Sequence, residues 1–431
     1  MRETETAQKP EKVILIGVDL DNTSGMTLEE SLDELEELAK TAGAEVVGRL
    51  TQNREAVHPG HYIGKGKAEE LKDLISLTEA DGVICDDELT SSQMKNLSEQ
   101  AGAKIMDRTM LILDIFSQRA QSAEGKIQVE LAQQKYNLSH LIGLGKSLSR
   151  QGGGHGGGIG ARRGGGEKKL ELDRRTIKER ISILNHELKE IRQQRKTSRD
   201  RRTKTSIPVM SLIGYTNAGK STLMNRLTAA GVMAEDKLFA TLDTTTRKMM
   251  LPSRNSVSGG EEVLLTDTVG FIQKLPHTLI EAFRATLEEL DYADVLLHIV
   301  DSSNPACDKQ MEVVYSTIDT LKLSAKPVLT VFNKLDKLAE PPICTDERAK
   351  ETVAVSAVTG EGIDKLLAAA LKILQARRCR MVLLIPYADG RMLSLVHDSC
   401  EILTEEHRED GTYLELYAEE NVKQQLVRFM V

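Results

Sequence analysis

The sequence predicts an α/β protein of several domains, with a long helical hairpin between two regions of alternating strands and helices. Three observations lead to this fold class. Short apolar runs alternate with helix-like segments over residues 12–106 and again over 207–376, as in sheets covered by helices. Between them, residues 108–202 carry the 4-3-4-3 spacing typical of packed helix pairs. The length of 431 residues also exceeds that of one compact domain.

Composition narrows the class of protein. Apolar residues make up 40% of the chain, but aromatics only 3%, so the cores must rest on Leu, Ile, Val and Met. The net charge of −8 argues against a generally basic nucleic-acid binder and leaves room for a local basic patch. The 5 Cys residues form no C-x-x-C pair, which indicates neither a zinc site nor a disulfide framework and fits a reducing cytosol.

Targeting segments are not evident in the sequence. The first ten residues are polar, unlike a signal peptide, and no apolar run reaches the roughly 18 residues of a membrane span. We therefore expect a cytoplasmic protein.

Residues 1–107 are expected to form an N-terminal α/β subdomain. Val13–Val18 has the length of a buried strand. Leu28–Lys40 has a helical apolar stripe, which Thr27 opens as a cap with Glu30 as its capping-box partner. The other expected elements are strands at Glu45–Leu50 and Gly82–Cys85 and helices at Ala68–Leu77 and Ser91–Ala101.

Residues 108–204 are expected to form an antiparallel helical hairpin with a glycine-rich tip. Half of the residues in Gly143–Gly166 are Gly. Since Gly costs about 1 kcal/mol per helical position relative to Ala, we expect this stretch to interrupt the helix. The 4-3-4-3 spacing appears on either side of it, at Ile127, Leu131, Gln134, Leu138 and Leu141, and at Ile177, Ile181, Leu184, Leu188 and Ile191.

Two more domains are expected after the hairpin. Residues 205–376 contain long buried-type strands such as Val295–Val300 and Val328–Phe332, typical of a doubly wound, mostly parallel sheet. Residues 377–431 are expected to form a small C-terminal α/β domain. Its expected elements are strands at Arg380–Ile385 and Tyr413–Tyr417 and a helix-like segment at Leu393–Glu405.

A phosphate-binding loop is predicted between the apolar run Val209–Ile213 and the helix-like segment Thr222–Leu227. The loop is Gly214-Tyr215-Thr216-Asn217-Ala218-Gly219-Lys220-Ser221, a full match to G-x-x-x-x-G-K-[ST]. Its glycines let the backbone curl around phosphates, and its N–H groups and the helix N-terminus face the anion. We expect Lys220 to reach the β- and γ-phosphates and Ser221 to bind magnesium.

A second Gly-Lys-Ser, at residues 145–147, is interpreted differently. The first glycine of the loop pattern would have to stand where His140 is found, and no strand precedes it. Lys146 is therefore interpreted as a charge of the hairpin's tip loop.

A second motif, Asp267-Thr268-Val269-Gly270, follows the apolar residues 263–265. An Asp at the end of a strand can hold the magnesium shell, and the Gly can offer its N–H to the γ-phosphate. Such a motif is weak alone, but its distance from the phosphate-binding loop makes it strong.

The third motif, Asn333-Lys334-Leu335-Asp336, predicts the base. Asp336 can accept from N1–H and the 2-amino group of guanine, whereas adenine offers neither, which gives roughly tenfold to over a hundredfold discrimination. We expect Asn333 to brace neighbouring loops and the Lys334 stem to cover the base plane. The backbone of Ser356-Ala357 would reach guanine O6. These motifs together predict a P-loop GTPase domain and disfavour a P-loop ATPase or kinase.

The threonine that joins magnesium must lie between the phosphate-binding loop and Asp267. The only Thr-rich candidate is Phe239-Ala240-Thr241-Leu242-Asp243-Thr244-Thr245-Thr246-Arg247, and spacing does not choose among its four Thr residues.

Phe271 stands where many GTPases carry a Gln that orients the attacking water. Phe cannot hydrogen-bond water, and positioned proton-transfer groups supply about 10²–10⁴-fold. We therefore predict slow intrinsic turnover, completed by a partner or by a residue elsewhere on the chain. The alternative is that Phe271 only packs and hydrolysis is unimportant.

These motifs, with Phe239–Asp243 and Asp267–Phe271, resemble the HflX family of ribosome-associated GTPases. The N-terminal half carries the resemblance too, in Gly64-Lys65-Gly66-Lys67, Ile127–Gln133 and Gly156–Gly160. The resemblance implies the four domains expected above and binding to the large ribosomal subunit, which some members split under stress.

The resemblance also implies site residues. The resemblance implies that Thr241 is the magnesium-binding threonine. It also implies a hydrophobic residue in place of the catalytic Gln, which Phe271 matches. Some members bind ATP through the N-terminal region, for which this sequence has no second nucleotide motif.

The hairpin supports ribosome binding on physical grounds. Residues 168–202 contain 13 Lys/Arg and 6 Asp/Glu, and Arg150, Arg162 and Arg163 lie in or beside the tip. A slim cationic tip suits an RNA cleft, where phosphates dominate affinity. We therefore expect a monomeric, ribosome-stimulated GTPase that acts in ribosome splitting, recycling or translation control under stress. It should be cytoplasmic and partly associated with ribosomes or membranes. The alternative is a GTPase switch that acts on a protein or membrane partner through the hairpin.

Overall fold

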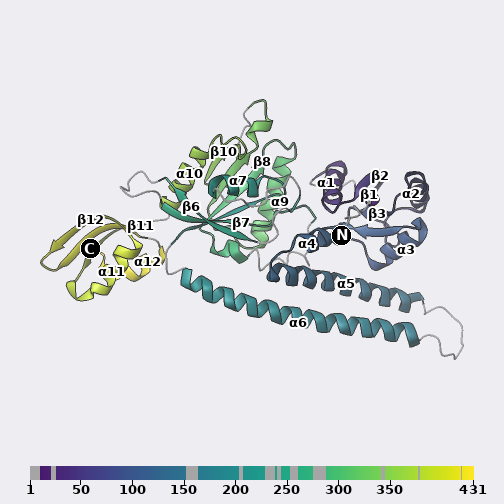
Figure 1. Ribbon diagram of the computed structural model, residues 1–431, viewed down its shortest axis with the longest axis horizontal. Coiled ribbons are helices and arrows are strands. Elements are labelled where there is room, and N and C mark those ends of the chain that lie inside the picture. Colours follow the sequence, from purple (N-terminus) through teal and green to yellow (C-terminus); the bar gives the residue numbers. More distant parts are fainter. Residues whose placement is uncertain are drawn as a thin grey trace, which may run out of the picture.

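The computed structural model describes residues 10–20, 26–151, 164–202, 207–228, 238–239, 244–252, 261–274, 288–340, 345–376, 379–418 and 420–431. Three sheets lie in a row, and a long helical hairpin runs beside two of them (Figure 1). This arrangement confirms the predicted α/β class. The domain boundaries proposed from the sequence stay a prediction.

The N-terminal region is a parallel four-stranded sheet in the order β2-β1-β3-β4. The predicted capping box is confirmed, since Thr27 and Glu30 exchange both hydrogen bonds, of 3.2 and 2.6 Å. Its elements are β1 (Lys12–Leu20), α1 (Leu28–Thr41), β2 (Glu45–Arg54), α2 (Lys65–Thr78), β3 (Gly82–Cys85), α3 (Ser91–Ala101), β4 (Lys104–Asp107) and α4 (Arg108–Arg119).

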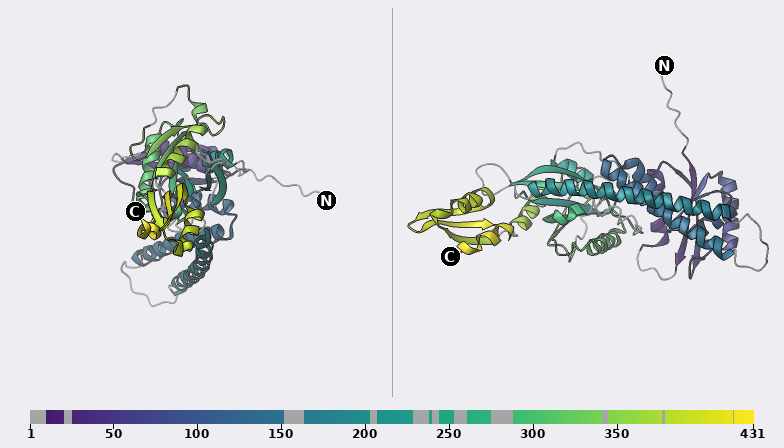
Figure 2. Two further views of the ribbon diagram at one scale, coloured as in Figure 1. Left: turned by 90° about the vertical axis from the view of Figure 1, so that its left-hand side faces the viewer. Right: turned by 90° about the horizontal axis from the view of Figure 1, so that it is seen from below.

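The hairpin consists of α5 (Ala123–Gln151) and α6 (Gly164–Arg202), which pack side by side. Its seam buries Leu131 against Leu184 and Leu188, as the spacing predicts. Arg180 Nε and Nη2 donate to the two carboxylate oxygens of Glu130, at 2.6 and 2.7 Å. With 39 residues, α6 is about 58 Å long and passes beneath both larger sheets (Figure 2).

One prediction about the hairpin is wrong. Helix α5 continues through Gly143 and Gly145 to Gln151, and α6 begins at Gly164, so both ends of the glycine-rich stretch are helical. Propagation of a helix that is already formed costs far less than nucleation, and isolated glycines do not stop it. The remaining stretch, 152–163, with Arg162 and Arg163, lies outside the described residues.

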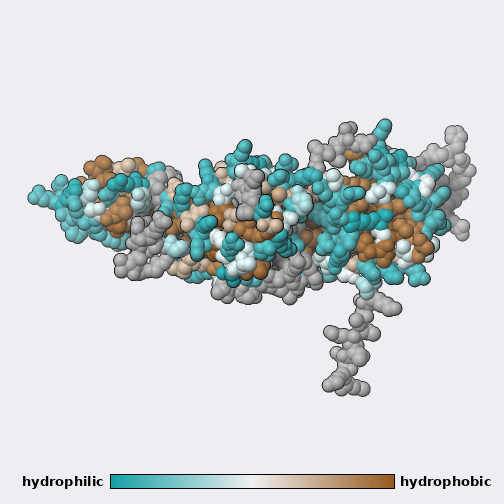
Figure 3. All heavy atoms as spheres, turned by 90° about the horizontal axis from the view of Figure 1, so that it is seen from above, coloured by the Kyte–Doolittle hydropathy of each residue, from teal (hydrophilic) through white to brown (hydrophobic). Residues whose placement is uncertain are grey.

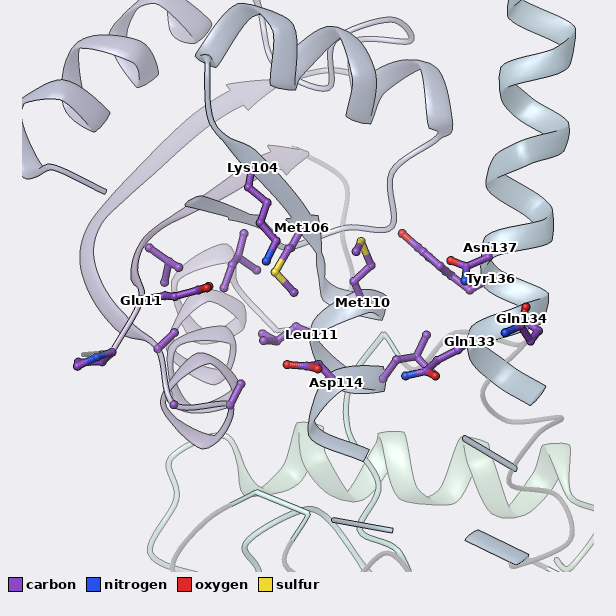
Figure 4. Close-up of a pocket in the computed structure, with 17 residues that line it drawn as sticks. Glu11, Lys104, Met106, Met110, Leu111, Asp114, Gln133, Gln134, Tyr136 and Asn137 are labelled. Carbon is purple, nitrogen blue, oxygen red and sulfur yellow. The ribbon is translucent and has the colours of Figure 1, made fainter. Parts of the chain in front are cut away.

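A pocket of about 680 Å³ lies where α5 crosses the amino ends of β1 and β4. Glu11 directly precedes β1, Lys104 opens β4, Asp114 comes from α4, and Gln133 and Asn137 come from α5 (Figure 4). Parallel sheets bind ligands at the carboxyl ends of their strands, so this pocket is not our candidate site.

The central region is a six-stranded sheet in the order β10-β9-β8-β5-β7-β6. All neighbouring pairs are parallel except β6 with β7, which matches the predicted doubly wound sheet. Its elements are β5 (Val209–Gly214), α7 (Lys220–Thr228), β6 (Thr245–Leu251), β7 (Glu261–Asp267), β8 (Val295–Asp301), α9 (Cys307–Thr320), β9 (Val328–Asn333), β10 (Glu351–Ala354) and α10 (Ile363–Ala376).

The C-terminal region corrects a second prediction. The segment Leu393–Glu405 is not one helix, because the helix ends at Ser399 and a strand begins at Glu401. That strand pairs with the next one across a turn, and long-range pairing overrides a short helical pattern. The antiparallel sheet has the order β11-β13-β12, and the elements are β11 (Cys379–Ile385), α11 (Gly390–Ser399), β12 (Glu401–Arg408), β13 (Gly411–Ala418) and α12 (Glu420–Leu426).

Hydrophilic residues cover most of the surface seen in Figure 3, with apolar residues in separate patches. Across the described parts of the chain, no helix combines the length and apolar content needed to cross a bilayer.

We predict that Leu184→Ala loosens the hairpin. Truncation of a fully buried leucine costs about 2–5 kcal/mol, and the seam has few other apolar contacts among the described residues. Hydrogen exchange measured by mass spectrometry should become faster along α6. Ile183→Ala is the matched control, since Ile183 is 50% exposed, and equal exchange in the two variants would contradict the seam.

Candidate functional site

The loops with the predicted motifs meet at one edge of the six-stranded sheet. They follow β5, β7, β9 and β10, whose carboxyl ends lie on the same side because these strands are parallel. Strand β5 pairs with β8 on one side and with β7 on the other, so the strand order reverses there. Such a reversal opens the crevice in which parallel sheets bind ligands.

Two glycines shape the phosphate-binding loop. Gly214 has φ +148°, and a Cβ there would lie 2.2 Å from the carbonyl oxygen of Ile299 in β8. Gly219 has φ +94°, and its Cβ would lie 2.2 Å from Nδ2 of Asn333. Any side chain would therefore collide with the neighbouring strand or loop, in addition to the backbone strain of a left-handed conformation.

Lys220 opens α7 and is buried beneath the loop. Its Nζ donates to the carbonyl oxygens of Tyr215 and Gly214, at 2.7 and 3.1 Å. Burial lowers the pKa of Lys220 to about 8, and the nearby Asp267 opposes this shift. Lys220 therefore remains mostly cationic at neutral pH, although its charge is poorly solvated.

Ser221 and Asp267 are brought together although 46 residues separate them. The Ser221 hydroxyl donates to Asp267 Oδ2 over 2.8 Å, and Asp267 is fully buried at the end of β7. Two such oxygen groups suit a hard cation such as Mg²⁺. Among the described residues, no cluster of three His, Cys, Asp or Glu could hold a metal alone. Other ligands would therefore have to come from phosphates, hydroxyls and water.

Asn333 joins two loops on the far side of the site. Its Nδ2 donates to the carbonyl oxygen of Ala218, and its Oδ1 accepts from the backbone N–H of Ala357, over 2.9 and 3.0 Å. Asp336 Oδ1 accepts from the Ser356 hydroxyl over 2.5 Å. The phosphate loop, the Asn333–Asp336 motif and the Ser356-Ala357 pair are thus connected through side-chain hydrogen bonds.

Lys334 has an unexpected partner. Its backbone is left-handed, with φ +68°, and its Nζ lies 2.7 Å from Asp301 Oδ2 at the end of β8. The pairing joins the motif to the carboxyl end of β8. The short helix Leu335–Lys337 follows Lys334.

Phe271 lies 3% exposed, and its backbone is attached to the phosphate loop. Its N–H donates to the Gly214 carbonyl over 3.1 Å, and its carbonyl accepts from Thr216 N–H over 2.8 Å. A Cβ on Gly270 would lie 2.9 Å from both Lys220 Nζ and Thr216 Cα. The aromatic ring packs in the core and offers no hydrogen bond to a water molecule.

The remaining predicted residues are placed as follows. Thr268 Oγ1 donates to the Leu212 carbonyl over 2.6 Å, and Val269 is buried. Phe239 is buried with φ +55°, and its ring lies 4.6 Å from that of Phe116 in α4. Thr222 lies in α7 and Asn217, with φ +59°, in the loop. Residues Ala240, Thr241, Leu242 and Asp243 lie outside the described residues.

Sequence reasoning missed the residues that reach this site from the N-terminal region. Glu34 of α1 accepts a hydrogen bond from the Tyr215 hydroxyl over 2.7 Å. Lys274, four residues after Gly270, pairs with Asp86 and Asp87. No local pattern signals such contacts, because the partners are more than 180 residues apart.

Comparison with protein-family models gives four matches along the chain. They are described as a GTP-binding GTPase N-terminal region (residues 29–117), a GTP-binding GTPase middle region (119–202), a 50S ribosome-binding GTPase (209–334) and an HflX C-terminal domain (344–428).

Two similar proteins and one solved structure are compared with the chain. GTPase HflX from Lacrimispora saccharolytica is 50% identical over 416 residues, which cover 96% of this chain and 95% of that protein. GTPase HflX from Escherichia coli is 41% identical over 386 residues, 89% of this chain and 88% of that protein. A crystal structure of the SsGBP and GDP complex covers 84% of this chain and 98% of its own, with 23% identity and a TM-score of 0.46.

We predict that Lys220 titrates near pH 8 in the nucleotide-free protein and at higher pH once GDP is bound. Burial lowers its pKa to about 8, whereas nearby phosphates stabilise the ammonium form. The ¹³Cε chemical shift of labelled lysine measures both midpoints, and the Lys220→Arg variant assigns the signal. A midpoint near the ordinary lysine value of about 10.4 in the free protein would contradict the burial argument.

Proposed function

The chain belongs to the HflX family of GTPases and hydrolyses GTP, and we propose that it does so on the large ribosomal subunit, in ribosome splitting, recycling or translation control under stress. The observation that supports this most is the match of residues 209–334 to a family described as a 50S ribosome-binding GTPase. The protein is proposed to act as a cytoplasmic monomer.

Each motif receives a role in this proposal. The backbone from Gly214 to Thr222, with Lys220, holds the β- and γ-phosphates. Asp336 and the backbone of Ser356-Ala357 select guanine, and Lys334 covers its plane. Support comes from the bonds of Asn333, which fix these loops relative to one another. Phe239–Asp243 is the proposed switch segment.

Magnesium fits the oxygen atoms present. Ser221 and Asp267, 2.8 Å apart, would hold it directly or through water, together with Thr241. Bound there, Mg²⁺ would neutralise charge on the phosphate oxygens during transfer. Lys220 stabilises the same charge from the loop side, and the Gly270 N–H is directed to the γ-phosphate.

The site is proposed to be a slow catalyst on its own. Because Phe271 is buried and attached to the phosphate loop, nothing at that position can orient the attacking water. Water-orienting and charge-stabilising groups must then come from the ribosome or from a rearranged segment of this chain. This reasoning supports stimulation of hydrolysis by the partner.

The hairpin is the proposed contact with ribosomal RNA. It carries 13 Lys/Arg against 6 Asp/Glu over residues 168–202, a local excess of positive charge in an acidic protein. Arg150, Arg162 and Arg163 at the tip would bind backbone phosphates.

We predict that Asp336→Asn changes the base specificity. An amide cannot accept from both N1–H and the 2-amino group, so GTP affinity should fall at least about tenfold. The amide can instead donate to the 2-oxo group of xanthine, so XTP binding should improve. Fluorescence titration with both nucleotides measures the change, and Asp364→Asn, an exposed residue of α10, serves as control. Unchanged GTP affinity would refute the role of Asp336.

The ribosomal proposal is tested with purified large subunits. We expect them to raise the GTPase rate of the natural protein and to cosediment with it in the presence of a non-hydrolysable GTP analogue. Substitution of Arg150, Arg162 and Arg163 with Ala should weaken binding and lower the salt dependence of log K by about 0.7 for each RNA phosphate that the variant no longer neutralises.

The matched control substitutes three exposed lysines of the central region, Lys322, Lys365 and Lys372. This variant has the same net charge and should bind normally. Equal binding of both variants to the large subunit would refute a role of the hairpin tip in ribosome binding. Absence from ribosomes in every nucleotide state would favour a protein or membrane partner instead.

A further inference from the structure

One hydroxyl of the phosphate loop is held from outside the six-stranded sheet. Tyr215, the second residue of the loop, is 4% exposed, and its Oη donates to Glu34 Oε1 of α1 over 2.7 Å. The same oxygen accepts the backbone N–H of Gln273 over 2.8 Å. The phenol thus joins the phosphate loop, the N-terminal region and the segment that follows Gly270.

Glu34 is itself held by Arg108, a buried residue at the start of α4. Arg108 donates to Glu34 Oε2 over 2.8 Å and to Asp86 Oδ1 over 2.7 Å. The other oxygen of Asp86 accepts from Lys274 Nζ over 2.5 Å. Since Lys274 directly follows Gln273, the contacts close into a ring. The Glu34 ring consists of Tyr215, Glu34, Arg108, Asp86, Lys274 and the backbone N–H of Gln273.

The charges of the Glu34 ring match its geometry. Burial alone would raise the pKa of Asp86, but the cations of Arg108 and Lys274 hold it below its ordinary value. Burial raises the pKa of Glu34, and Arg108 and the Tyr215 hydroxyl oppose that rise. Each carboxylate oxygen of Glu34 and of Asp86 therefore receives a donor.

Apolar contacts already hold the two regions together. Phe116 of α4 packs edge-on against Phe239, and one apolar core includes both of these rings together with Phe271 and Ile272. Buried ion pairs are expensive to desolvate, and apolar residues often stabilise an interface equally well. Charged hydrogen bonds additionally fix the relative orientation of the groups that they join. We therefore interpret the Glu34 ring as a device that orients the phosphate loop and the segment after Gly270, and not as the main attraction between the two regions.

The Glu34 ring fixes the segment on which the chemistry depends. Phe271 is attached to the loop through Gly214 and Thr216, and the Gln273 N–H is attached through Tyr215. Between these bonds and the end of β7, Gly270 has no room for a Cβ. Its N–H is the group assigned above to the γ-phosphate, and Phe271 supplies no water-orienting group. Hydrolysis then depends on positioning, where a shift of about 1 Å can cost about 100-fold.

We propose that Glu34 is a positioning residue for GTP hydrolysis, which acts through Tyr215 to hold Gly270 at the γ-phosphate. This inference rests on the role proposed for Gly270 and is independent of the ribosomal partner. Glu34 touches neither nucleotide nor water in this scheme. The N-terminal region thereby contributes to the rate of the reaction although it holds none of the nucleotide motifs.

The test uses the full-length protein without ribosomes. Glu34→Gln places an amide against Arg108, and Tyr215→Phe removes both hydrogen bonds of the phenol. We expect kcat to fall about tenfold in each variant, with KM for GTP and affinity for GDP within about twofold, because the groups that bind the base and the β-phosphate are intact. The double variant should be no slower than the slower single one, since both changes break one connection.

The matched control is Glu30→Gln. It removes the ion pair of 2.8 Å between Glu30 of α1 and Lys309 of α9, which joins the same two regions outside the Glu34 ring. Gln also works in the capping box, so α1 stays intact. This variant should keep the natural kcat. An equal loss in Glu30→Gln and Glu34→Gln would mean that docking of the two regions matters, and not the Glu34 ring.

Other outcomes would also overturn the proposal. An unchanged kcat in Glu34→Gln, or a raised KM with the natural kcat, is incompatible with positioning. If circular dichroism shows that Glu34→Gln fails to fold, Tyr215→Phe, which removes one atom, decides the matter. Gly270→Ala distinguishes the role of Gly270 from the role of Glu34. A natural kcat in Gly270→Ala would refute the role of Gly270. A lowered kcat in Gly270→Ala together with a natural kcat in Glu34→Gln would refute only the role of Glu34.

Discussion

The nucleotide site depends on the reversal of strand order at β5. The chain leaves β5 at a point where β8 lies on one side and β7 on the other, and Gly214 comes so close to Ile299 that no side chain fits between them. This close approach sets the direction in which the phosphate loop leaves the sheet. The other motif loops follow strands on both sides of β5, so their place relative to the phosphates is a consequence of the same crossing.

Close packing at this crossing also decides the chemistry. Lys220 is covered so well that its ammonium group loses solvation and turns to the carbonyl oxygens of the loop. Phe271 is buried beside the loop, and its backbone is hydrogen-bonded to Gly214 and Thr216. The site is thus rich in groups that bind charge and poor in groups that move protons. This composition is the basis of the proposal that a partner or a rearranged segment of the chain completes the site for hydrolysis.

The sequence predicts the parts of this fold that are encoded locally. The phosphate loop, the capping box of Thr27 and Glu30 and the buried strands of the central sheet each follow from a short pattern. Two helix predictions failed where tertiary contacts or helix propagation decide, at Gly143 and at Leu393–Glu405. The hydrogen bond between Tyr215 and Glu34 could not be predicted. In the sequence, a single tyrosine in a loop and a glutamate on an amphipathic helix cannot be distinguished from solvent-exposed residues.

The hairpin is held in two ways. Helix α5 follows α4 and packs against α3 and α4, where Tyr136 and His140 bind Asp107 and Leu89 of the N-terminal region, and the chain leads from the end of α6 at Arg202 to the start of β5 at Val209. Seven residue steps span at most about 25 Å, so the second tether is short. An arm of about 58 Å is thus fixed along one region and joined by a short connection to the other. Any displacement of α6 relative to the N-terminal region would therefore be passed to β5, the strand that carries the phosphate loop.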